Sequence, residues 1–358
     1  MKSDWYETTL GTCVRFQNGK KRPVEGGVIP VYGGNGVLDH TNRSNNRNCV
    51  IIGRVGAYCG SVFREKGICW VSDNAISATV KSDVDIDYIY YFLKNAGLNR
   101  RHIGTSQPLL TQEILNSISI YLPSLPTQKK IAAILSALDE KIATNRAIND
   151  NLQQQAMALY AEMFLNSSDN NVTSGTLSDI AVITMGQSPS GSSYNEDGVG
   201  EVFYQGRAEF GFRFPKRRLF TTEPKRMSEA GDVLLSVRAP VGDLNIAYER
   251  CCIGRGLGAI HSKTGHSSFV LYTMFALRSQ LDVFNGEGTV FGSINRDALN
   301  AIPIDIPPVT EIDQFEVVAH PIDELIRANY EENCRLEAIR DSLLPKLMSG
   351  EINIVTIK

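Results

Sequence analysis

The residue types that most often perform catalysis or hold metals form no recognisable pattern in this chain. The five histidines do not fall at metal-ligand spacings, and no HExxH, GxSxG or Walker sequence occurs. GRGLG, which starts at Gly254, does not complete a GxGxxG pattern, and IDIPP, which starts at Ile304, lacks the Asn/Asp-Pro-Pro-aromatic signature of amino-methyltransferases. The seven cysteines include no CxxC pair, so neither a disulfide framework nor a zinc ribbon is expected. We therefore expect no catalytic site, no metal and no cofactor in this chain.

Polar side chains suited to a different chemistry gather in loops rich in Gly, Ser and Pro. Lys20, Lys21 and Arg22 precede an amide-rich stretch, YGGNGVLDHTNRSNN, which starts at Tyr32 and which we interpret as a loop. Amide and guanidinium groups read the edges of DNA bases, whereas Lys and backbone N–H groups hold phosphates. Each basic cluster taken alone is better explained as solvated surface, but the combination with amides favours contact with DNA.

An internal repeat shows how these loops are positioned. GTSQPLLTQEILNSISIYLPSLPTQ starts at Gly104, and a similar string, GTVFGSINRDALNAIPIDIPPVTEI, starts at Gly288. The offset from Gly104 to Gly288 holds without a gap well beyond these strings and matches Asp139 with Asp323. The chain therefore reads as a domain, a long helix, a second domain and a second long helix.

Two long helices follow from the spacing of apolar residues. From about Thr127 to Phe164 these residues alternate by four and three, which is typical of a coiled-coil seam. The first seam consists of Ile131, Leu135, Leu138, Ile142, Asn145, Asn149, Leu152, Ala156, Leu159 and Met163. The second consists of Phe315, Ala319, Ile322, Ile326, Asn329, Asn333, Leu336, Arg340, Leu343 and Leu347. Either helix could pack on its own domain, but two seams in repeat register favour packing against each other. Pro345 predicts a kink in the last turns of the second helix.

The connectivity predicts that the two helices run antiparallel. The second domain connects the C-terminal end of the first helix to the N-terminal end of the second. If the helices ran parallel, this domain would have to carry the chain back along the whole first helix, whereas antiparallel helices need no such connection. This arrangement sets Asn145 opposite Asn333 and Asn149 opposite Asn329. Buried Asn pairs cost stability but fix the register of a helix pair. We expect an α/β (α+β) fold, a pseudo-twofold tandem repeat of two globular heads separated by two long antiparallel coiled-coil helices, with the chain ends close together.

Composition and strand patterns set the expected domain bounds. The 358 residues are 42 % hydrophobic and 21 % charged, with a net charge of −3, as in an ordinary globular protein of two or three domains. Short apolar runs bounded by Gly, Pro and Asn predict mixed α/β heads at residues 1–123 and 167–307. The helices are expected within 124–166 and 308–358. No apolar run could span a membrane and MKSDWYETTL lacks the core of a signal peptide, so we expect a cytoplasmic protein.

Several strings, in a fixed order, carry a family resemblance. They are GKKRPVEGGVIPVYGGNGVLDHTN, VIIGRVGAYCGSVFREKGICWVSDNAI, YLPSLPTQKKIAAILSALDEKI, MGQSPSGSSYN, LLSVRAPVGDLNIA, CCIGRGLGAI and LLPKLMSGEI. Over nearly its whole length the chain resembles the specificity subunit of type I restriction–modification systems. The resemblance implies two target-recognition domains, each reading half of a bipartite double-stranded DNA site, and helices that act as a spacer and dock two methylation subunits. It also implies a restriction subunit, with S-adenosylmethionine, ATP and Mg²⁺ belonging to the partners. VTEIDQFEVVAHPIDELI departs from the pattern, because it lacks Gln-Lys-Lys and carries Pro321.

The candidate DNA contacts share polar, amide or guanidinium side chains in loops at or near the family's variable read-out regions. In the first head they are Lys21, Arg22, Tyr32, Asn35, Asn42, Arg54 and Gln107. In the second head they are Gln187, Ser190, Tyr194, Gln205, Arg207 and Arg238. For several of them a role in loop structure or packing is an equal alternative, and Arg54 and Arg238 could instead support the fold.

Three interpretations of function remain open. The first is DNA recognition within a methyltransferase/endonuclease complex. The second is a self-contained DNA-modifying enzyme, which a cofactor or metal motif would favour. The third is a coiled-coil scaffold whose heads bind protein, which the net charge of −3 mildly favours. The repeat, the family resemblance and the amide-rich loops favour the first.

Overall fold

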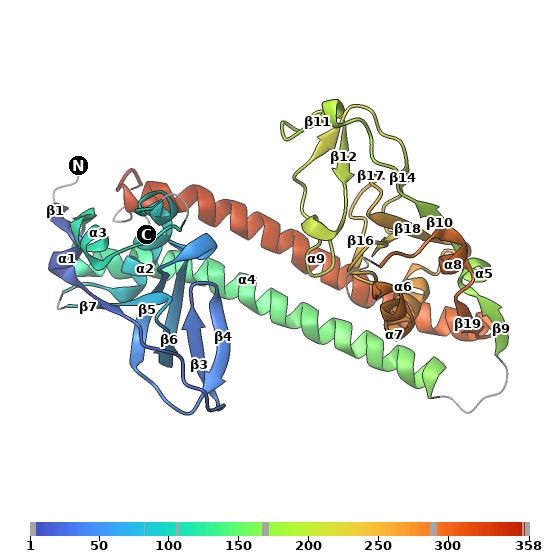
Figure 1. The fold of residues 1–358 in the computed structure, drawn as a ribbon, viewed down its shortest axis with the longest axis horizontal. Coiled ribbons are helices and arrows are strands. Elements are labelled where there is room, and N and C mark those ends of the chain that lie inside the picture. The colour runs from blue at the N-terminus through green and yellow to red at the C-terminus, as the bar shows by residue number, and fades with distance from the viewer. Residues whose placement is uncertain are drawn as a thin grey trace. The chain divides into compact units, whose positions relative to one another are not determined.

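The computed structural model describes residues 5–81, 83–104, 107–166, 172–286, 292–352 and 354. The chain forms two compact units, one of residues 1–145 with 330–358 and one of residues 146–329. Each unit holds one head and a part of each long helix (Figure 1).

The first head is built on a six-stranded mixed sheet. Its strands, in spatial order, are β2 (Val14–Asn18), β7 (Ala75–Val80), β5 (Asn46–Gly53), β6 (Val62–Val71), β3 (Ile29–Gly33) and β4 (Gly36–Thr41). Helix α2 (Ile86–Asn95) packs on β5, β6 and β7 and buries Tyr88 and Ile89 in the core. Asp85 begins α2, because its carboxylate accepts a hydrogen bond from the Tyr88 N–H at 2.9 Å.

A smaller layer connects this sheet to the helices. Strand β1 (Tyr6–Thr9) pairs antiparallel with β8 (Ser119–Leu122), and the short helices α1 (Leu10–Cys13) and α3 (Gln112–Ser117) lie beside them. Short 3-10 turns occur at Gly56–Tyr58 and Leu98–Arg100.

The second head repeats this plan and adds a second sheet. Its first sheet has the order β10 (Ala181–Met185), β18 (Leu257–Ser262), β15 (Val233–Ser236) and β16 (Leu244–Ile246). The added sheet has the order β11 (Tyr194–Asn195), β13 (Phe220–Thr221), β12 (Glu201–Tyr204), β17 (Cys251–Ile253) and β14 (Met227–Ser228). The remaining elements are β9 (Thr173–Thr176), α5 (Leu177–Ile180), α6 (Ser267–Ala276), α7 (Arg278–Asp282), α8 (Arg296–Asn300) and β19 (Pro303–Ile306), with 3-10 turns at Gly191–Ser193, Arg207–Glu209 and Val283–Asn285.

The structure confirms the tandem repeat. The order β10-β18-β15-β16 corresponds to β2-β7-β5-β6, and β9 pairs with β19 as β1 pairs with β8. The offset that relates Gly288 to Gly104 also relates β19 to β8 along the whole length of both strands. One element was misread from the sequence. Residues Gly36–Thr41 form β4 rather than a loop, because an edge strand whose middle residues are exposed has no need of an apolar face.

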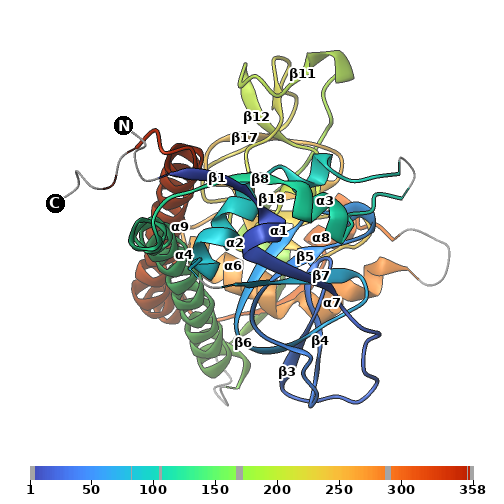
Figure 2. The ribbon, with the colours of Figure 1, turned by 90° about the vertical axis from the view of Figure 1, so that its left-hand side faces the viewer.

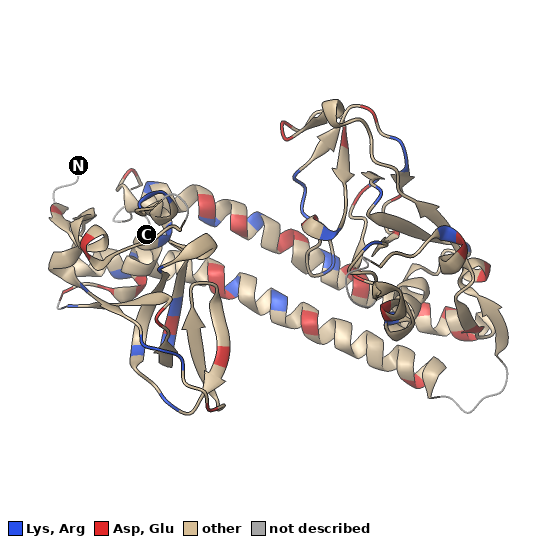
Figure 3. Cartoon of the chain, viewed as in Figure 1, with Lys and Arg blue, Asp and Glu red and all other residues tan. Residues whose placement is uncertain are grey.

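The two long helices are antiparallel, as predicted. Helix α4 (Leu125–Tyr160), extended by a π-helical turn at Ala161–Leu165, is the helix expected within 124–166. Helix α9 (Val309–Met348) is the helix expected within 308–358. In the first unit Asp139 and Asn145 of α4 contact Arg340 and Asn333 of α9, respectively. In the second unit the ring of Tyr160 lies 5.6 Å from that of Phe315. Figure 2 shows the helices side by side, and Figure 3 shows that both carry charges of both signs.

The prolines do not end α9. The helix continues through Pro321 and Pro345 to Met348. The turn after Pro345 is held by packing, because Leu344, Leu347 and Met348 are buried in the core of the first unit. Pro345 therefore does not interrupt the helix, and the kink expected there stays a prediction.

A tyrosine and an aspartate join each head to a long helix. In the first unit the hydroxyl of Tyr91 on α2 donates to Asp139 on α4 at 2.9 Å, and Arg340 of α9 lies 2.7 Å from the same carboxylate. In the second unit the hydroxyl of Tyr272 on α6 donates to Asp323 on α9 at 2.9 Å. The repeat thus preserves the contact between the head helix and the long helix.

The second of these contacts is the more deeply buried. Arg213 is only 3 % exposed and lies 3.4 Å from Asp323, and burial raises the pKa of that carboxyl against the opposing effect of Arg213. Burial likewise raises the pKa of Tyr272 far above its usual value. Removing either charge would leave the other buried and unpaired.

Both ends of the described chain lie in the first unit. Gly350, at φ +69°, comes so near Trp5 that an added Cβ would lie 3.1 Å from the indole ring. Ile354 is buried in the core that contains Leu10.

Candidate nucleic-acid interface

Loops that carry predicted contact residues meet at one end of the first sheet. Asn35 occupies the turn between β3 and β4, and Arg54 follows β5 directly. The amide N–H of Arg54 donates to the carbonyl of Asn74, and the N–H of Leu110 donates to the carbonyl of Arg54, each at 2.9 Å. These bonds bring the loop that carries Gln107 beside the ends of β5 and β7.

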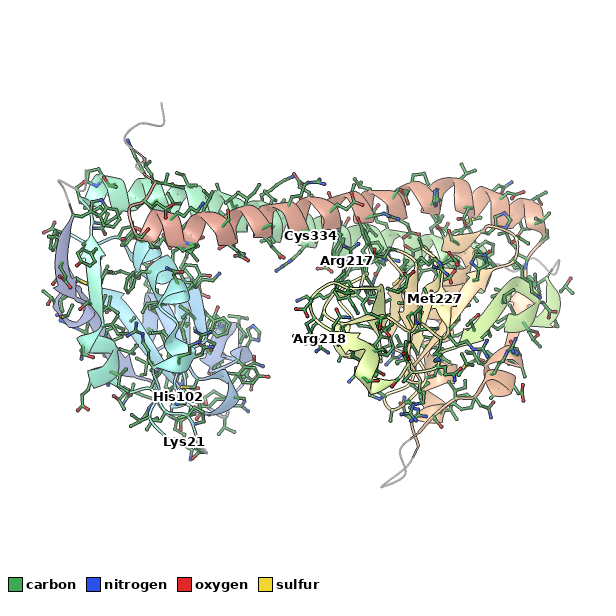
Figure 4. The ribbon with its side chains drawn as sticks, turned by 90° about the horizontal axis from the view of Figure 1, so that it is seen from above. Lys21, His102, Arg217, Arg218, Met227 and Cys334 are labelled. Carbon is green, nitrogen blue, oxygen red and sulfur yellow. The ribbon has the colours of Figure 1, made fainter. Side chains whose placement is uncertain are left out.

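Lys21 belongs to the same end of the sheet. The N–H of Lys20 donates to the carbonyl of Val71 at 3.0 Å, which fixes the chain just before Lys21 beside the end of β6. Lys21 is exposed, and Figure 4 shows it with His102 on the side of the first head away from the long helices. The Nε atom of Arg54 is buried and has no hydrogen-bond partner within the described residues, so this guanidinium keeps unused donor capacity.

Three other candidates of the first head are placed differently. Tyr32 is only 9 % exposed and its hydroxyl donates to Glu65 at 2.9 Å, so most of its side chain packs in the core. Arg22 is exposed but lies 3.6 Å from Asp39, which neutralises part of its charge. Asn42 follows the last residue of β4, at the opposite end of that strand from Asn35.

The second head gathers its candidates at the corresponding end of its sheet. Gln187 follows β10, and its N–H donates to the carbonyl of Ile253 at 2.9 Å. Gln205 follows β12, and its carbonyl accepts from Gly256 at 3.1 Å. Arg238 lies just beyond β15. These positions converge on the loop of residues 254–256.

A pair of backbone bridges shows that the two surfaces correspond. Val55 forms an isolated β-bridge with Leu109 in the first head, and Arg238 forms one with Ser293 in the second. Ser293 is the repeat counterpart of Leu109, because each stands five positions after the glycine that opens its repeated string. The same end of the same sheet therefore presents polar side chains in both heads.

The remaining candidates of the second head are tied to protein groups. Arg207 forms an ion pair with Asp243. The Ser190 hydroxyl shares a hydrogen bond with that of Ser192 at 2.8 Å. The hydroxyl of Tyr194 donates to the carbonyl of Pro189 at 3.1 Å, and its ring centre lies 4.9 Å from that of Phe203. These contacts order the loop and leave less side chain available to DNA.

Ion pairing separates the arginines of the second head into two groups. Most have an acidic partner; they are Arg207, Arg213, Arg217, Arg218, Arg250 and Arg278. The other four, Arg226, Arg238, Arg255 and Arg296, are exposed and have no ion pair with any described residue. Of these four, Arg238 and Arg255 line a surface hollow of about 750 Å³. Arg255 is not among the contacts predicted from the sequence, where its only signal is the GRGLG string, which does not complete a nucleotide-binding motif.

The asparagine pairs between the two long helices have the partners that the antiparallel alignment predicts. In the first unit Asn145 Nδ2 donates to Asn333 Oδ1 at 3.0 Å, and in the second unit Asn329 Nδ2 donates to Asn149 Oδ1 at 2.8 Å. Asn145, Asn149 and Asn333 are buried. Their role in fixing the register remains a prediction.

No group of three or more His, Cys, Asp or Glu side chains in the described part of the chain is arranged to hold a metal ion. None of the helices among the described residues has the length and apolar character needed to cross a bilayer.

The family model of the type I restriction modification DNA specificity domain matches residues 2–154 and 170–333. The chain belongs to this family. The two matched segments each contain one of the heads described above, and membership makes this specificity chain the DNA-recognition component of a type I restriction–modification system.

Individual relatives agree with this assignment. The specificity chain is 31 % identical over 301 residues to a protein of Methanocaldococcus jannaschii named as the MjaX specificity subunit of a type I restriction enzyme, covering 77 % of this chain and 70 % of that one. It is 31 % identical over 140 residues to the EcoprrI specificity subunit of Escherichia coli, covering 37 % and 35 % of the two chains. Its fold is similar to the crystal structure of an S subunit from M. genitalium, with a TM-score of 0.63, 18 % identity and 96 % of each chain covered.

Proposed function

We propose that each head reads one half of a bipartite double-stranded DNA site. The observation that carries this proposal is the pair of corresponding polar surfaces, one at the same sheet end of each head. The side chains they present differ, with Asn35, Arg54 and Gln107 in the first head and Gln187 and Gln205 in the second. Because amides and guanidiniums read base edges, two different sets of them predict two different half-site sequences.

The long helices are proposed to set the distance between the half-sites. Helix α4 contains 36 residues and α9 contains 40, so each is about 54–60 Å long at 1.5 Å per residue. Buried amide pairs allow one favoured alignment of the two helices, since a shifted alignment would leave these groups without partners.

The outer faces of the helices are proposed to dock two methylation subunits. In the second unit α9 exposes Val317 and Val318, which are 74 % and 48 % exposed, and Leu325 about two turns further. At the start of α4, in the first unit, the exposed residues include Lys129 and Lys130. Apolar side chains on an otherwise charged helix support burial against a partner. The two docking faces differ in character, in keeping with the departure of the second helix start from the family pattern.

Catalysis is proposed to reside in the partners and not in this chain. The methylation subunits would bring S-adenosylmethionine, and a restriction subunit would bring ATP and Mg²⁺, all within the cytoplasm. The direct test incubates the full chain and target DNA with labelled S-adenosylmethionine, with and without the methylation subunit. Transfer that requires the partner is expected. Methyl transfer by the chain alone would refute the proposal and favour a self-contained enzyme.

Methylome sequencing of a host that carries the chain and its partners tests the bipartite reading. We expect one methylated motif with two specified halves and an unspecified spacer. Inserting one heptad into both helices, in register, lengthens the pair by about 10 Å, or about three base pairs. The spacer should change while both half-sites stay the same. If the spacer length did not change, the proposal that the helices set the distance between the half-sites would be wrong.

A further inference from the structure

We propose that the hollow at the strand ends of the second head binds one phosphate of the DNA backbone between Arg238 and Arg255. This inference rests on the proposed function and adds a ligand group and a role to it. The two arginines would bind the phosphate backbone of the DNA and so position the second head, while neighbouring amide side chains contact the bases.

The composition of the hollow favours an anion. The hollow is open to solvent and has a volume of about 750 Å³, within the range of sites that hold small ligands. Its other lining residues are neutral; they are Met185, Gly186, Val237, Ala239, Gly292, Ser293, Ile294 and Asn295. Among the described residues, two guanidinium groups therefore share a surface depression that no carboxylate lines, whereas six of the other eight arginines of this head are paired with acids.

Backbone hydrogen bonds hold the two arginines near each other. The N–H of Val237 donates to the carbonyl of Gly256 at 2.9 Å, so the residues directly adjacent to Arg238 and Arg255 are bonded together. The Arg255 N–H donates to the Ser188 hydroxyl at 3.2 Å. The side chains are exposed while their attachment points are fixed, so little backbone ordering would be needed on binding.

The first head lacks this pair of charges. Strand β18 is the repeat counterpart of β7, and matching their first residues, Leu257 and Ala75, aligns Arg255 with Asp73. Val55 occupies the position of Arg238 in the paired backbone bridges. An acid and a valine cannot bind phosphate. The phosphate site is therefore a property of the second head and cannot be explained as a part of the shared fold.

The test compares a double variant, R238Q/R255Q, with the wild type and with R226Q. Arg226 is a suitable control because it is exposed in the same head, has no ion pair with a described residue and lies outside the hollow. Binding of the full chain, alone and with its methylation subunits, is measured against salt concentration. Loss of one phosphate contact should reduce the slope of log K against log salt by about 0.9 for target and non-target DNA alike. The methylated motif should be unchanged.

A methylphosphonate scan of the second half-site locates the contact. Neutralising one particular linkage should weaken binding by the wild type and by R226Q, but should have no further effect on R238Q/R255Q. If no linkage behaves in this way, or if the double variant changes the preferred bases and not the slope, the inference is wrong. Failure of the wild type to prefer any DNA sequence would instead overturn the proposed function. Unchanged circular dichroism and melting temperature establish that the variants are folded.

Discussion

The buried amide pair of the first unit allows a prediction in which two substitutions restore what one removes. Asn145 is fully buried and donates to Asn333 Oδ1 at 3.0 Å and to Glu332 Oε2 at 2.7 Å. Asn145→Leu removes both bonds and leaves the carbonyl oxygen of Asn333 without its donor, but it also removes the Asn145 Oδ1, which is buried and has no hydrogen-bond partner among the described residues. An unsatisfied buried polar group costs about 1–3 kcal/mol, so we expect a net loss of about 2 kcal/mol in the free energy of unfolding.

The partner substitution should cost less. In Asn333→Leu the amide of Asn145 keeps its bond to Glu332, so the expected loss is about 1 kcal/mol, the net value of one hydrogen bond. In the double leucine variant no amide remains to be satisfied, and two leucines extend the apolar seam beside Ile142 and Leu336. Apolar replacement of a whole buried polar pair is often neutral or stabilising, so the double variant should be within about 1 kcal/mol of the wild type or above it.

Tryptophan fluorescence measures this effect in the relevant unit. The two tryptophans, Trp5 and Trp70, both belong to the first unit, so urea unfolding followed by their emission reports on that unit. Denaturation curves of the wild type, two single variants and the double variant form a complete cycle. A double variant less stable than Asn145→Leu alone would refute the reasoning.

The same substitution should change the response to pH. The bond from Asn145, followed by that from Lys141, lowers the pKa of Glu332 below its usual 4.5. A carboxyl whose pKa falls on folding stabilises the protein above its unfolded pKa, and this stabilisation is lost as the pH falls through its folded pKa. The difference in stability between the wild type and Asn145→Leu should therefore narrow below about pH 4.5.

Three further predictions concern other parts of the chain. Lys21→Gln should reduce the salt slope of DNA binding by about 0.9, whereas Arg22→Gln should reduce it less, because Arg22 is already paired with an acid; salt titrations separate the two. A thiol reagent at pH 8 should label one cysteine per folded chain, Cys334, because the others are buried and burial raises the pKa of Cys251 to about 12; peptide mapping identifies the labelled site. Tyr272→Phe should lower the free energy of unfolding by about 1–2 kcal/mol, since it removes a donor from a mostly buried carboxylate, and urea unfolding followed by circular dichroism measures the loss.

The repeat and the helix pair could be predicted because their signals are regular along the sequence. A constant offset relates β8 to β19, and a 4–3 spacing marks the seam from Ile131 onward. Strand β4 was missed because its four middle residues, two apolar followed by two polar, are all exposed at the sheet edge and show no alternation of apolar side chains. The second seam already predicted that α9 continues past Pro345 to Leu347, and the structure shows that the turn after Pro345 is packed in the core of the first unit.

The contact residues were harder to predict because their availability depends on distant partners. Arg207 and Arg238 look alike in the sequence, but Arg207 is paired with Asp243, which is far from it along the chain. Tyr32 lies in a polar stretch, yet strand pairing turns it into the core. Arg255 could not be predicted as a contact residue, because the reason to propose it is the hollow that it lines together with Arg238.

The first unit is built from two separate segments of the chain, which affects when it can fold during synthesis. The second unit is a single continuous segment, residues 146–329, whereas the first needs both residues 1–145 and residues 330–358. Leu347 and Ile354 belong to the same core as Leu10, which leaves the ribosome early. At about 5–20 residues per second, the first head waits roughly 10–40 s for the last part of its core. During that time the second unit is being synthesised and the seam side chains Ile131 and Leu135 have no partner helix, so the nascent chain exposes apolar surface that chaperones can bind.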